Sequence, residues 1–254
     1  MTNDTSAKRA AFRALHETGC FIIPNPWDLG GVRLFEKLGF KAIASTSAGY
    51  AWSRGKDDGQ LNRDEVLSHF RDLCQATDLP VNGDFEAGFA DEPEEVGANV
   101  LLAVDTGVAG ISIEDRTGND LYPLPLAIER VKAARKAIDA SGHNVVLVGR
   151  AEGVLIGRSN VKEATDRLVA YAQAGADCLY APGVTDLPAI QSMVSAAAPR
   201  PVNVLLLGST MKVSDLAAAG VRRVSIGSGL ARIARSAVEQ AAQLLVQSGR
   251  LPAE

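Results

Sequence analysis

The sequence predicts a (β/α)8 TIM barrel with an extra N-terminal helix, a fold of the α/β class. Short runs rich in β-branched residues alternate with longer helical stretches, which favours parallel strands joined by helices. Eight such runs are present, and eight parallel strands are the number that closes this barrel. Glycines at positions 107, 175 and 220 stand between a helical stretch and the next strand, where a left-handed helix cap needs no Cβ. The same helix-to-strand joint is thus used repeatedly.

The expected elements extend over the whole chain. The strands are Cys20–Pro24, Ala42–Thr46, Val81–Glu86, Gly110–Glu114, Val145–Arg150, Cys178–Ala181, Val202–Leu206 and Arg223–Ile226. Apolar residues at spacings of three and four predict helices that include Arg63–Ala76, Pro93–Thr106, Leu124–Ala140, Val161–Ala174 and Leu230–Gln247. The added helix, Ala7–Thr18, precedes the first strand. Because no linker or low-complexity segment interrupts this order, we expect residues 1–254 to form one barrel domain.

Composition excludes several classes of partner. The formal net charge of −4 and the absence of a basic cluster disfavour binding to nucleic acid. Every apolar stretch is shorter than the roughly 20 residues that span a bilayer, so no membrane association is expected. The polar start Met1–Arg9 does not resemble a signal peptide, and we expect a cytoplasmic protein. Cys20, Cys74 and Cys178 lack metal-ligand spacing and are expected to be free thiols.

Acidic side chains end two successive strands of the expected barrel. Residues two apart in a strand face the same side, so Asp84 and Glu86 point together while Phe85 faces the helices. Glu114 ends the next strand and faces inward with Ser112. Crowded carboxylates repel one another unless a cation or a proton lies between them. Oxygen ligands without histidine or cysteine predict a Mg²⁺ or Mn²⁺ site, although the same acids could cap helices or pair with arginines.

Two further segments fit an anion site at the same end of the barrel. Arg150, which ends the fifth strand together with Glu152, can hold a substrate carboxylate through two parallel hydrogen bonds. It can equally form a structural salt bridge with one of the acids. The second strand runs into four small residues whose backbone N–H groups can approach an anion closely: Thr46, Ser47, Ala48 and Gly49. A tight turn would need the same residues.

These segments together resemble the isocitrate lyase / phosphoenolpyruvate mutase superfamily over nearly the whole chain. Its acidic strand end followed by Ala-Gly-Tyr-Gly is similar to Asp84-Phe-Glu-Ala-Gly-Phe89, and its Ile-Glu-Asp strand end to Ile113–Asp115. Its Ser-Gly-x-Gly anion loop is similar to Thr46–Gly49, and its Ala-Arg-Thr-Asp strand end to Gly149–Glu152. The acid that follows a proline in the next loop of the family corresponds to Asp58.

The resemblance implies a set of site residues and a homo-oligomer, either a dimer or a tetramer. It implies that Asp84 binds Mg²⁺ and that Asp58, Glu86 and Glu114 mainly hold metal-bound waters. The metal then chelates the carboxylate and keto oxygens of a small α-keto acid, which is the expected partner. Arg150 holds that carboxylate, and the amides of residues 46–49 position its oxygens. Catalysis is therefore assigned to Arg150, Asp58 and Glu114.

One departure from the family determines the expected reaction. The lyases carry Lys-Lys/Arg-Cys-Gly-His after the fourth strand, whereas Arg116-Thr-Gly-Asn-Asp-Leu-Tyr122 stands here without the acid/base thiol. Cys20 and Cys178 lie at strand starts, the wrong end of the barrel, so cleavage of isocitrate or methylisocitrate is disfavoured. We expect a Mg²⁺-dependent lyase or decarboxylase, a carbon–carbon lyase that acts on an oxaloacetate-like α-keto acid through a metal-stabilised pyruvate enolate. Asn119 is assigned to substrate binding, and Tyr122 or a metal-bound water is expected to supply the proton.

Three alternatives stay open. The first is the C–P bond chemistry of a phosphoenolpyruvate mutase or phosphonopyruvate hydrolase. The second is a phosphate-sugar enzyme, because Leu207-Gly-Ser-Thr210 and Ile226-Gly-Ser-Gly229 follow the last two strands, the usual phosphate site of barrels. The third is a barrel that binds a metabolite without catalysis. The apolar face of Leu230–Gln247 is expected to pack on the barrel or on a neighbouring subunit; exchange of terminal helices between subunits is a habit of the family it resembles.

Overall fold

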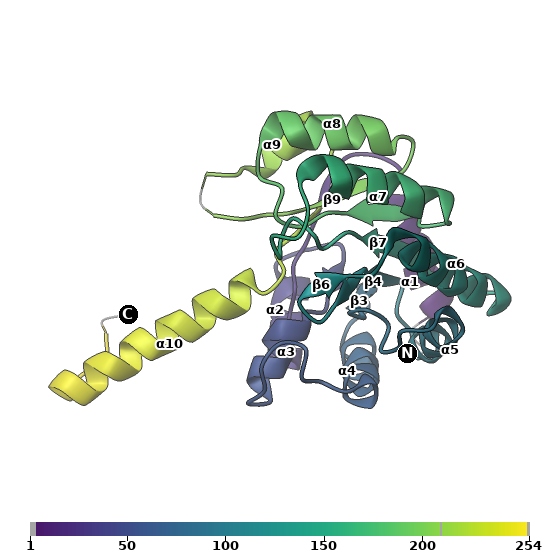
Figure 1. Ribbon diagram of the computed structural model, residues 1–254. Coiled ribbons are helices and arrows are strands. Elements are labelled where there is room, and N and C mark those ends of the chain that lie inside the picture. Colours follow the sequence, from purple (N-terminus) through teal and green to yellow (C-terminus); the bar gives the residue numbers. More distant parts are fainter. Residues whose placement is uncertain (1–3, 209, 253–254) are drawn as a thin grey trace.

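The barrel is built from eight parallel strands that surround a central axis (Figure 1). The structure is a computed structural model that describes residues 4–208 and 210–252. The strands are β1 (Phe21–Ile23), β2 (Ile43–Ala44), β3 (Val81–Asp84), β4 (Gly110–Glu114), β7 (Val146–Arg150), β8 (Cys178–Tyr180), β9 (Val202–Leu205) and β10 (Arg223–Ser225). Their order is β1-β10-β9-β8-β7-β4-β3-β2. The Ala44 amide donates to the Pro24 carbonyl at 2.9 Å and joins the two ends of the sheet. The predicted (β/α)8 fold is confirmed.

Ten helices lie outside or beneath the strands in the described part of the chain. They are α1 (Thr5–Leu15), α2 (Leu29–Lys37), α3 (Ser47–Ser53), α4 (Arg63–Ala76), α5 (Pro93–Val104), α6 (Leu124–Ala140), α7 (Val161–Gln173), α8 (Leu187–Ala197), α9 (Val213–Ala218) and α10 (Gly229–Ser248). The bounds of α4 and α6 agree with the predicted ranges, and Asn62 forms a capping box with Glu65 at the start of α4. The glycines at 107, 175 and 220 have φ between 87° and 104°, which confirms the predicted joints.

The apolar core has two parts. The larger part lies between strands and helices and contains Phe85, Ile111 and Ile113, the strand residues expected to face outward. The smaller part lies inside the barrel, where Phe12 of α1 is fully buried and closes the amino-terminal end. The added N-terminal helix is therefore a plug for the end of the barrel opposite the expected site.

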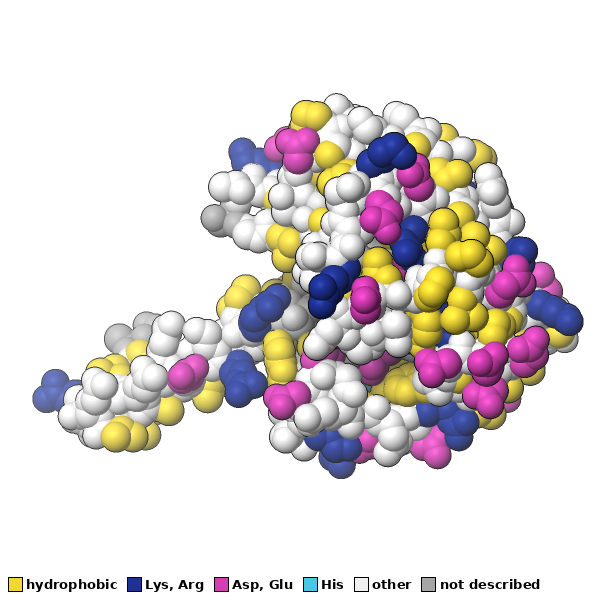
Figure 2. Space-filling view, viewed as in Figure 1, with side chains coloured by type: hydrophobic (Ala, Val, Ile, Leu, Met, Phe, Trp, Pro, Cys, Tyr) yellow, Lys and Arg dark blue, Asp and Glu magenta, His cyan; other side chains and the backbone are white. Residues whose placement is uncertain are grey.

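The last helix does not pack along its own barrel. α10 projects away from the strands (Figure 1), and hydrophobic side chains lie along it (Figure 2). Of its described residues only Ala231 is buried, whereas Ile233 and Val238 are 67% and 69% exposed. Arg235 in the second turn still lies over the Trp52 ring of α3, at 5.8 Å. Of the two surfaces expected for this face, packing on the chain's own barrel is therefore wrong beyond the second turn. In residues 4–208 and 210–252, no helix is both long and apolar enough to cross a bilayer.

A small antiparallel hairpin follows β4 where the sequence pattern indicated only a loop. It consists of β5 (Arg116–Thr117) and β6 (Asp120–Leu121), with Gly118 in a left-handed turn conformation at φ 57°. The Tyr122 amide then donates to the Asp115 carbonyl at 2.8 Å and ties the hairpin back to the end of β4. This hairpin extends the wall of the barrel above the carboxyl ends of the strands.

Candidate active site

A cavity of about 640 Å³ lies at the carboxyl ends of the strands. Asp84, Glu114 and Arg150 are the last residues of β3, β4 and β7, which are neighbours in the sheet. Glu114 is directly opposite Arg150 in the register of the β4 and β7 ladder. The strand order therefore brings these three side chains together, as the alternation of residues predicted.

Arg150 is the centre of this group. Its Nε and Nη2 bond both carboxylate oxygens of Glu152 at 2.5 and 2.8 Å. Its Nη1 lies 3.4 Å from Asp84 and 3.3 Å from Glu114. Burial acts against the charge of this guanidinium, but the three acids hold its pKa well above the ordinary value. The salt bridge that was an alternative role for Arg150 is thus observed. One side of the guanidinium is bound to Glu152, and Nη1 faces Asp84 and Glu114.

Glu86 reaches the cavity in a different way from the one predicted. The strand ends at Asp84, and Glu86 follows in a left-handed turn with φ 48°, so the two do not form a simple strand pair. Its Oε1 is buried without a hydrogen-bond partner. Burial, with the charges of Asp84 and Asp58, raises the pKa of Glu86 to about 8. A left-handed backbone is uncommon for residues other than glycine, so the surrounding structure must stabilise this conformation of Glu86.

Crowding of acids perturbs two more carboxyl groups. Burial raises the pKa of Glu114 to about 8, against the lowering effect of Arg150. Partial burial and the charge of Asp84 raise the pKa of Asp58, which lines the same cavity. An acid whose pKa is raised toward neutrality lacks compensating positive charge. The carboxyl groups at this end of the barrel therefore outnumber the positive charges near them.

The acids present fit a hard divalent cation. Mg²⁺ in proteins commonly takes one or two carboxylates and keeps several waters, so it does not need a full cage of side chains. Among residues 4–208 and 210–252, no three His, Cys, Asp or Glu are grouped as the ligands of one ion. Glu86 Oε1 nevertheless lacks a hydrogen-bond partner, and burial together with neighbouring acids raises the pKa of both Glu86 and Glu114. Asp84 would hold such an ion, and Glu86, Glu114 and Asp58 would face its waters.

The predicted anion loop has another role in the structure. Thr46–Gly49 begins helix α3, where the Thr46 hydroxyl accepts from the Gly49 amide at 3.3 Å and Thr46 is buried. Of the four residues only Ser47 lines the cavity; its amide donates to Asp84 at 3.2 Å. Gly49 borders a different hollow, against α10. The expectation of four free amides is corrected, since the Gly49 amide bonds the Thr46 cap and the Ser47 amide bonds Asp84.

The hairpin supplies the outer wall. Arg116, Thr117, Gly118 and Asn119 all line the cavity, so Asn119 lies where the prediction required. The Asn119 carbonyl accepts from Arg158 Nε at 2.7 Å, which anchors the hairpin tip. The Tyr122 hydroxyl, also at the cavity, donates to Asp91 in a short hydrogen bond.

A buried network behind the cavity was not assigned from the sequence. Asp115 accepts from the Glu152 amide at 2.8 Å, from Arg167 at 3.1 Å and from the Tyr171 hydroxyl at 2.5 Å. Its own amide donates to the Arg150 carbonyl at 3.1 Å. Asp115 therefore fixes the backbone that runs from Arg150 to Glu152. Its place directly after Glu114 is a signal in the sequence, but its partners come from a distant helix.

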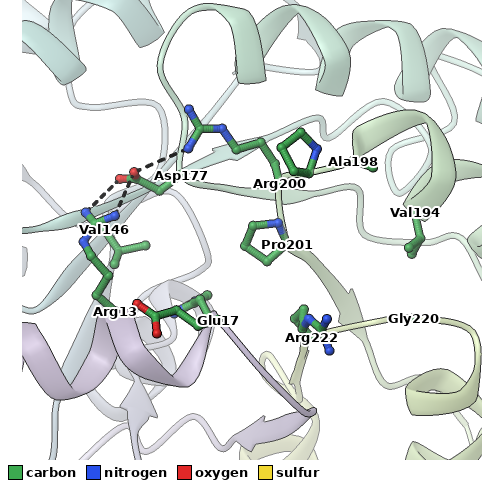
Figure 3. A pocket seen from close by; sticks show the side chains of 12 residues that line it. Arg13, Glu17, Val146, Asp177, Val194, Ala198, Arg200, Pro201, Gly220 and Arg222 are labelled. Carbon is green, nitrogen blue, oxygen red and sulfur yellow. Dashed lines mark hydrogen bonds and ion pairs between the residues drawn. The ribbon is translucent and has the colours of Figure 1, made fainter.

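A second cavity lies at the opposite end of the strands (Figure 3). There Asp177, just before β8, pairs with Arg13 and Arg200 of the cavity wall.

The loop after β10, suspected to bind phosphate, lies at the carboxyl ends of the strands. In it, the Ile226 and Gly227 amides donate to Asn25 Oδ1 at 3.0 and 2.8 Å. Two amides of the suspected phosphate loop are thus already used, which weighs against the phosphate-sugar alternative. Ser209, in the other suspected loop, lies outside the described residues.

Comparison with known proteins identifies the family of this chain. The phosphoenolpyruvate phosphomutase family model matches residues 12–246. An uncharacterized protein of Mycobacterium tuberculosis is 28% identical over 95% of this chain and 91% of its own length. A 2-methylisocitrate lyase of Halalkalibacterium halodurans is 27% identical over 94% of this chain and 82% of its own. An oxaloacetate decarboxylase of Rhodopseudomonas palustris is 29% identical over 74% of this chain and 68% of its own.

A solved structure is still more similar. A Burkholderia cenocepacia protein, provisionally described as a lyase/mutase, is 44% identical and superposes with a TM-score of 0.94 over 97% of this chain and 91% of its own. The names of the relatives, a lyase and a decarboxylase, agree with the predicted class of enzyme, a carbon–carbon lyase. With the family model covering nearly the whole sequence, the chain belongs to the phosphoenolpyruvate phosphomutase family, and the predicted superfamily is confirmed.

Proposed function

We propose that this protein is a Mg²⁺-dependent lyase or decarboxylase that acts on a small, oxaloacetate-like α-keto acid and releases pyruvate through its enolate. The observation that carries the proposal is the group at the carboxyl ends of the strands, where Arg150 lies among Asp84, Glu114 and Glu152. This group offers both an excess of oxygen donors for a hard cation and an arginine for a carboxylate.

The chain's own residues divide the work between binding and positioning. Glu152 occupies Nε and Nη2 of Arg150 and fixes the plane of the guanidinium. The Nη1 edge, which contacts Asp84 and Glu114, is then the edge that would receive a substrate carboxylate. A bound Mg²⁺ would supply positive charge where the keto oxygen becomes negative, an effect worth several kcal/mol. Arg150 adds a second positive charge at the same end of the substrate.

The enolate has to be protonated after the bond at C3 breaks. Tyr122 is poorly suited, because its hydroxyl is committed to Asp91 and its pKa is raised, chiefly by burial. Water in the cavity is the better donor, and the half-buried Glu86 faces that water as a group able to exchange a proton near neutral pH. We therefore assign proton delivery to water rather than to Tyr122.

C–P bond chemistry is the second candidate, and it uses the same cavity. The family model that matches the chain is named for phosphoenolpyruvate phosphomutase. A relative named as an oxaloacetate decarboxylase favours the carboxylate as the group that leaves. Both reactions share the pyruvate end of the substrate and differ only in the group attached to C3.

A pyruvate-release assay over oxaloacetate, substituted malates and phosphonopyruvate tests the proposal directly. We expect pyruvate from oxaloacetate in the presence of Mg²⁺ and none above the uncatalysed rate with excess EDTA. In parallel, titration calorimetry should detect oxalate, a mimic of the enolate, only when Mg²⁺ is present. Metal-independent turnover, or no turnover of any of these substrates, would contradict the proposal.

We also propose that the protein is a homo-oligomer in which α10 packs on another copy. The support is the exposed apolar face of a helix that leaves its own barrel (Figure 2). Light scattering should give the mass of a dimer or tetramer. Replacing both Ile233 and Val238 by glutamate should shift this mass toward that of one chain, and an unchanged mass would contradict the assignment of the interface.

A further inference from the structure

A second arginine faces the cavity from the hairpin. Arg116 lies two residues beyond Glu114, above the strand ends, and lines the cavity with Thr117 and Asn119. We propose that Arg116 binds an anionic group on C3 of the α-keto acid, either a carboxylate or a phosphonate, and so selects substrates with two anionic ends. This inference rests on the proposed function, because it assumes that Arg150 holds the other end.

The guanidinium of Arg116 is largely uncommitted. Its Nε donates to the Gly118 carbonyl at 2.8 Å, and its two terminal nitrogens form no hydrogen bond or ion pair with the described residues. By contrast, all three nitrogens of Arg150 contact acids. Arginine with both terminal nitrogens free is suited to paired hydrogen bonds with a carboxylate or phosphonate.

The charges around the cavity give Arg116 a position distinct from Arg150. Of the charged residues that line it, five are acids and only these two are basic: Asp58, Glu86, Asp91, Glu114, Glu152, Arg116 and Arg150. Arg116 is close enough for its charge to act on both Asp58 and Glu86. Arg116 lies on the hairpin in β5, whereas Arg150 is the last residue of β7. A substrate with one anionic end at each arginine would span the cavity from its floor to its outer wall.

A simpler reading gives Arg116 no ligand. In that reading its charge only offsets the surplus of acids, and its Nε only shapes the hairpin turn. The two readings predict different consequences of removing the charge. A pure counter-ion would repel Mg²⁺, so its loss would tighten Mg²⁺ binding and change every ligand alike. A group that binds the C3 substituent would affect only ligands that carry that substituent.

The test compares ligands with and without an anionic C3 substituent in R116Q and R116K. Oxalate with Mg²⁺ has no C3, and oxaloacetate and phosphonopyruvate carry a carboxylate and a phosphonate there. We expect R116Q to weaken the binding of either oxaloacetate or phosphonopyruvate by roughly tenfold or more, measured as KM or as the inhibition constant. R116K should restore part of this lost affinity. Oxalate affinity should stay within about twofold of the unsubstituted protein. Whichever ligand loses affinity identifies the natural substituent.

R158Q is the matched control for the hairpin. Arg158 bonds the Asn119 carbonyl and so supports the hairpin without lining the cavity. Equal losses in R116Q and R158Q, equal losses for oxalate and oxaloacetate, or no loss in R116Q would each overturn the role of Arg116. If the unsubstituted protein does not bind oxalate with Mg²⁺, the proposed function fails and this inference fails with it. The oxalate measurement therefore separates the two failures.

Discussion

The two ends of this barrel carry charge clusters of opposite construction. At the carboxyl ends of the strands, one arginine, Arg150, contacts Asp84, Glu114 and Glu152. At the amino ends, one acid, Asp177, pairs with Arg13 at 3.0 Å and Arg200 at 4.0 Å (Figure 3). It also pairs with Arg135 at 2.9 Å.

The difference lies in what each cluster leaves unpaired. Asp177 also bonds the Leu147 amide at 2.9 Å, so its oxygens are fully used in joining α1, α6 and the start of β7. The cluster around Arg150 leaves Glu86 Oε1 without a hydrogen-bond partner, and burial raises the pKa of Glu114 despite the lowering effect of Arg150. The Asp177 cluster therefore stabilises the fold, whereas the Arg150 cluster remains short of positive charge, as a binding site for a cation and a substrate must be.

Substitution of Asp84 should have the largest effect. Asp84→Ala removes the proposed metal ligand beside Arg150. We expect kcat/KM for pyruvate release to fall by about 10³-fold or more. The free energy of unfolding should change little, since crowding of acids is relieved at the same time. Activity close to that of the unsubstituted protein would show that the Arg150 cluster is not the catalytic one.

Asp177→Asn is the counterpart at the opposite end. It removes the acid that pairs with Arg13 and one of the two acids that pair with Arg135, which keeps Asp139 at 2.8 Å. We expect a loss of about 2 kcal/mol in the free energy of unfolding. Denaturant titration measures this loss. kcat/KM at a temperature where the variant is folded should remain within about threefold. None of the described residues that pair with Asp177 lines the cavity at the carboxyl ends. A variant that is as stable as the unsubstituted protein but inactive would show that the Asp177 cluster serves catalysis and not the stability of the fold.

The pH dependence of the metal-free protein should come from the carboxyl-end cluster. A folded-state pKa of about 8 for Glu114, above its ordinary value of 4.5, means that the folded form holds a proton that the unfolded form has released. Stability should therefore fall by a few kcal/mol as the pH rises from about 4.5 to 8, since each unit of the difference in pKa corresponds to about 1.4 kcal/mol. Denaturation at several pH values with EDTA measures it. Glu114→Gln should flatten this slope, and a slope equal to that of the unsubstituted protein would count against this origin.

The smallest effect is expected at Cys178. This thiol is fully buried at the start of β8, next to Asp177 and far from the carboxyl ends of the strands. Burial raises its pKa to about 11, so it is a poor nucleophile and a poor base. Cys178→Ala should change kcat by less than about twofold and stability by about 1 kcal/mol. A large loss of kcat would mean that chemistry reaches the amino-terminal end.

Much of the fold could be predicted because it depends on local pattern. The two-residue alternation placed Phe85 among the helices and Glu114 at the cavity, and the repeated glycine joints fixed where strands begin. Apolar periodicity gave the bounds of α4 and α6. These signals act within one element and need no information about its neighbours.

The site was only partly predictable. Asp84, Glu114 and Arg150 follow from strand ends that any parallel barrel brings together. The turn that carries Glu86 and the helix cap made by Thr46 could not be predicted in this way. The exact end of a strand and the exact start of a helix depend on a few hydrogen bonds. The hairpin that presents Arg116 also escaped prediction, since its short strands carry little pattern of their own.

By itself, the sequence determined the parallel barrel and the family, because hydrophobic period, glycine caps and acids at strand ends are written in consecutive residues. Only the tertiary structure decided which charges meet. Asp115 meets Arg167 and Tyr171, and Asp177 meets Arg13, through contacts between residues 52 to 164 positions apart. Electrostatic partners are set by distance in space, and folding alone brings such distant positions within a few ångströms of each other.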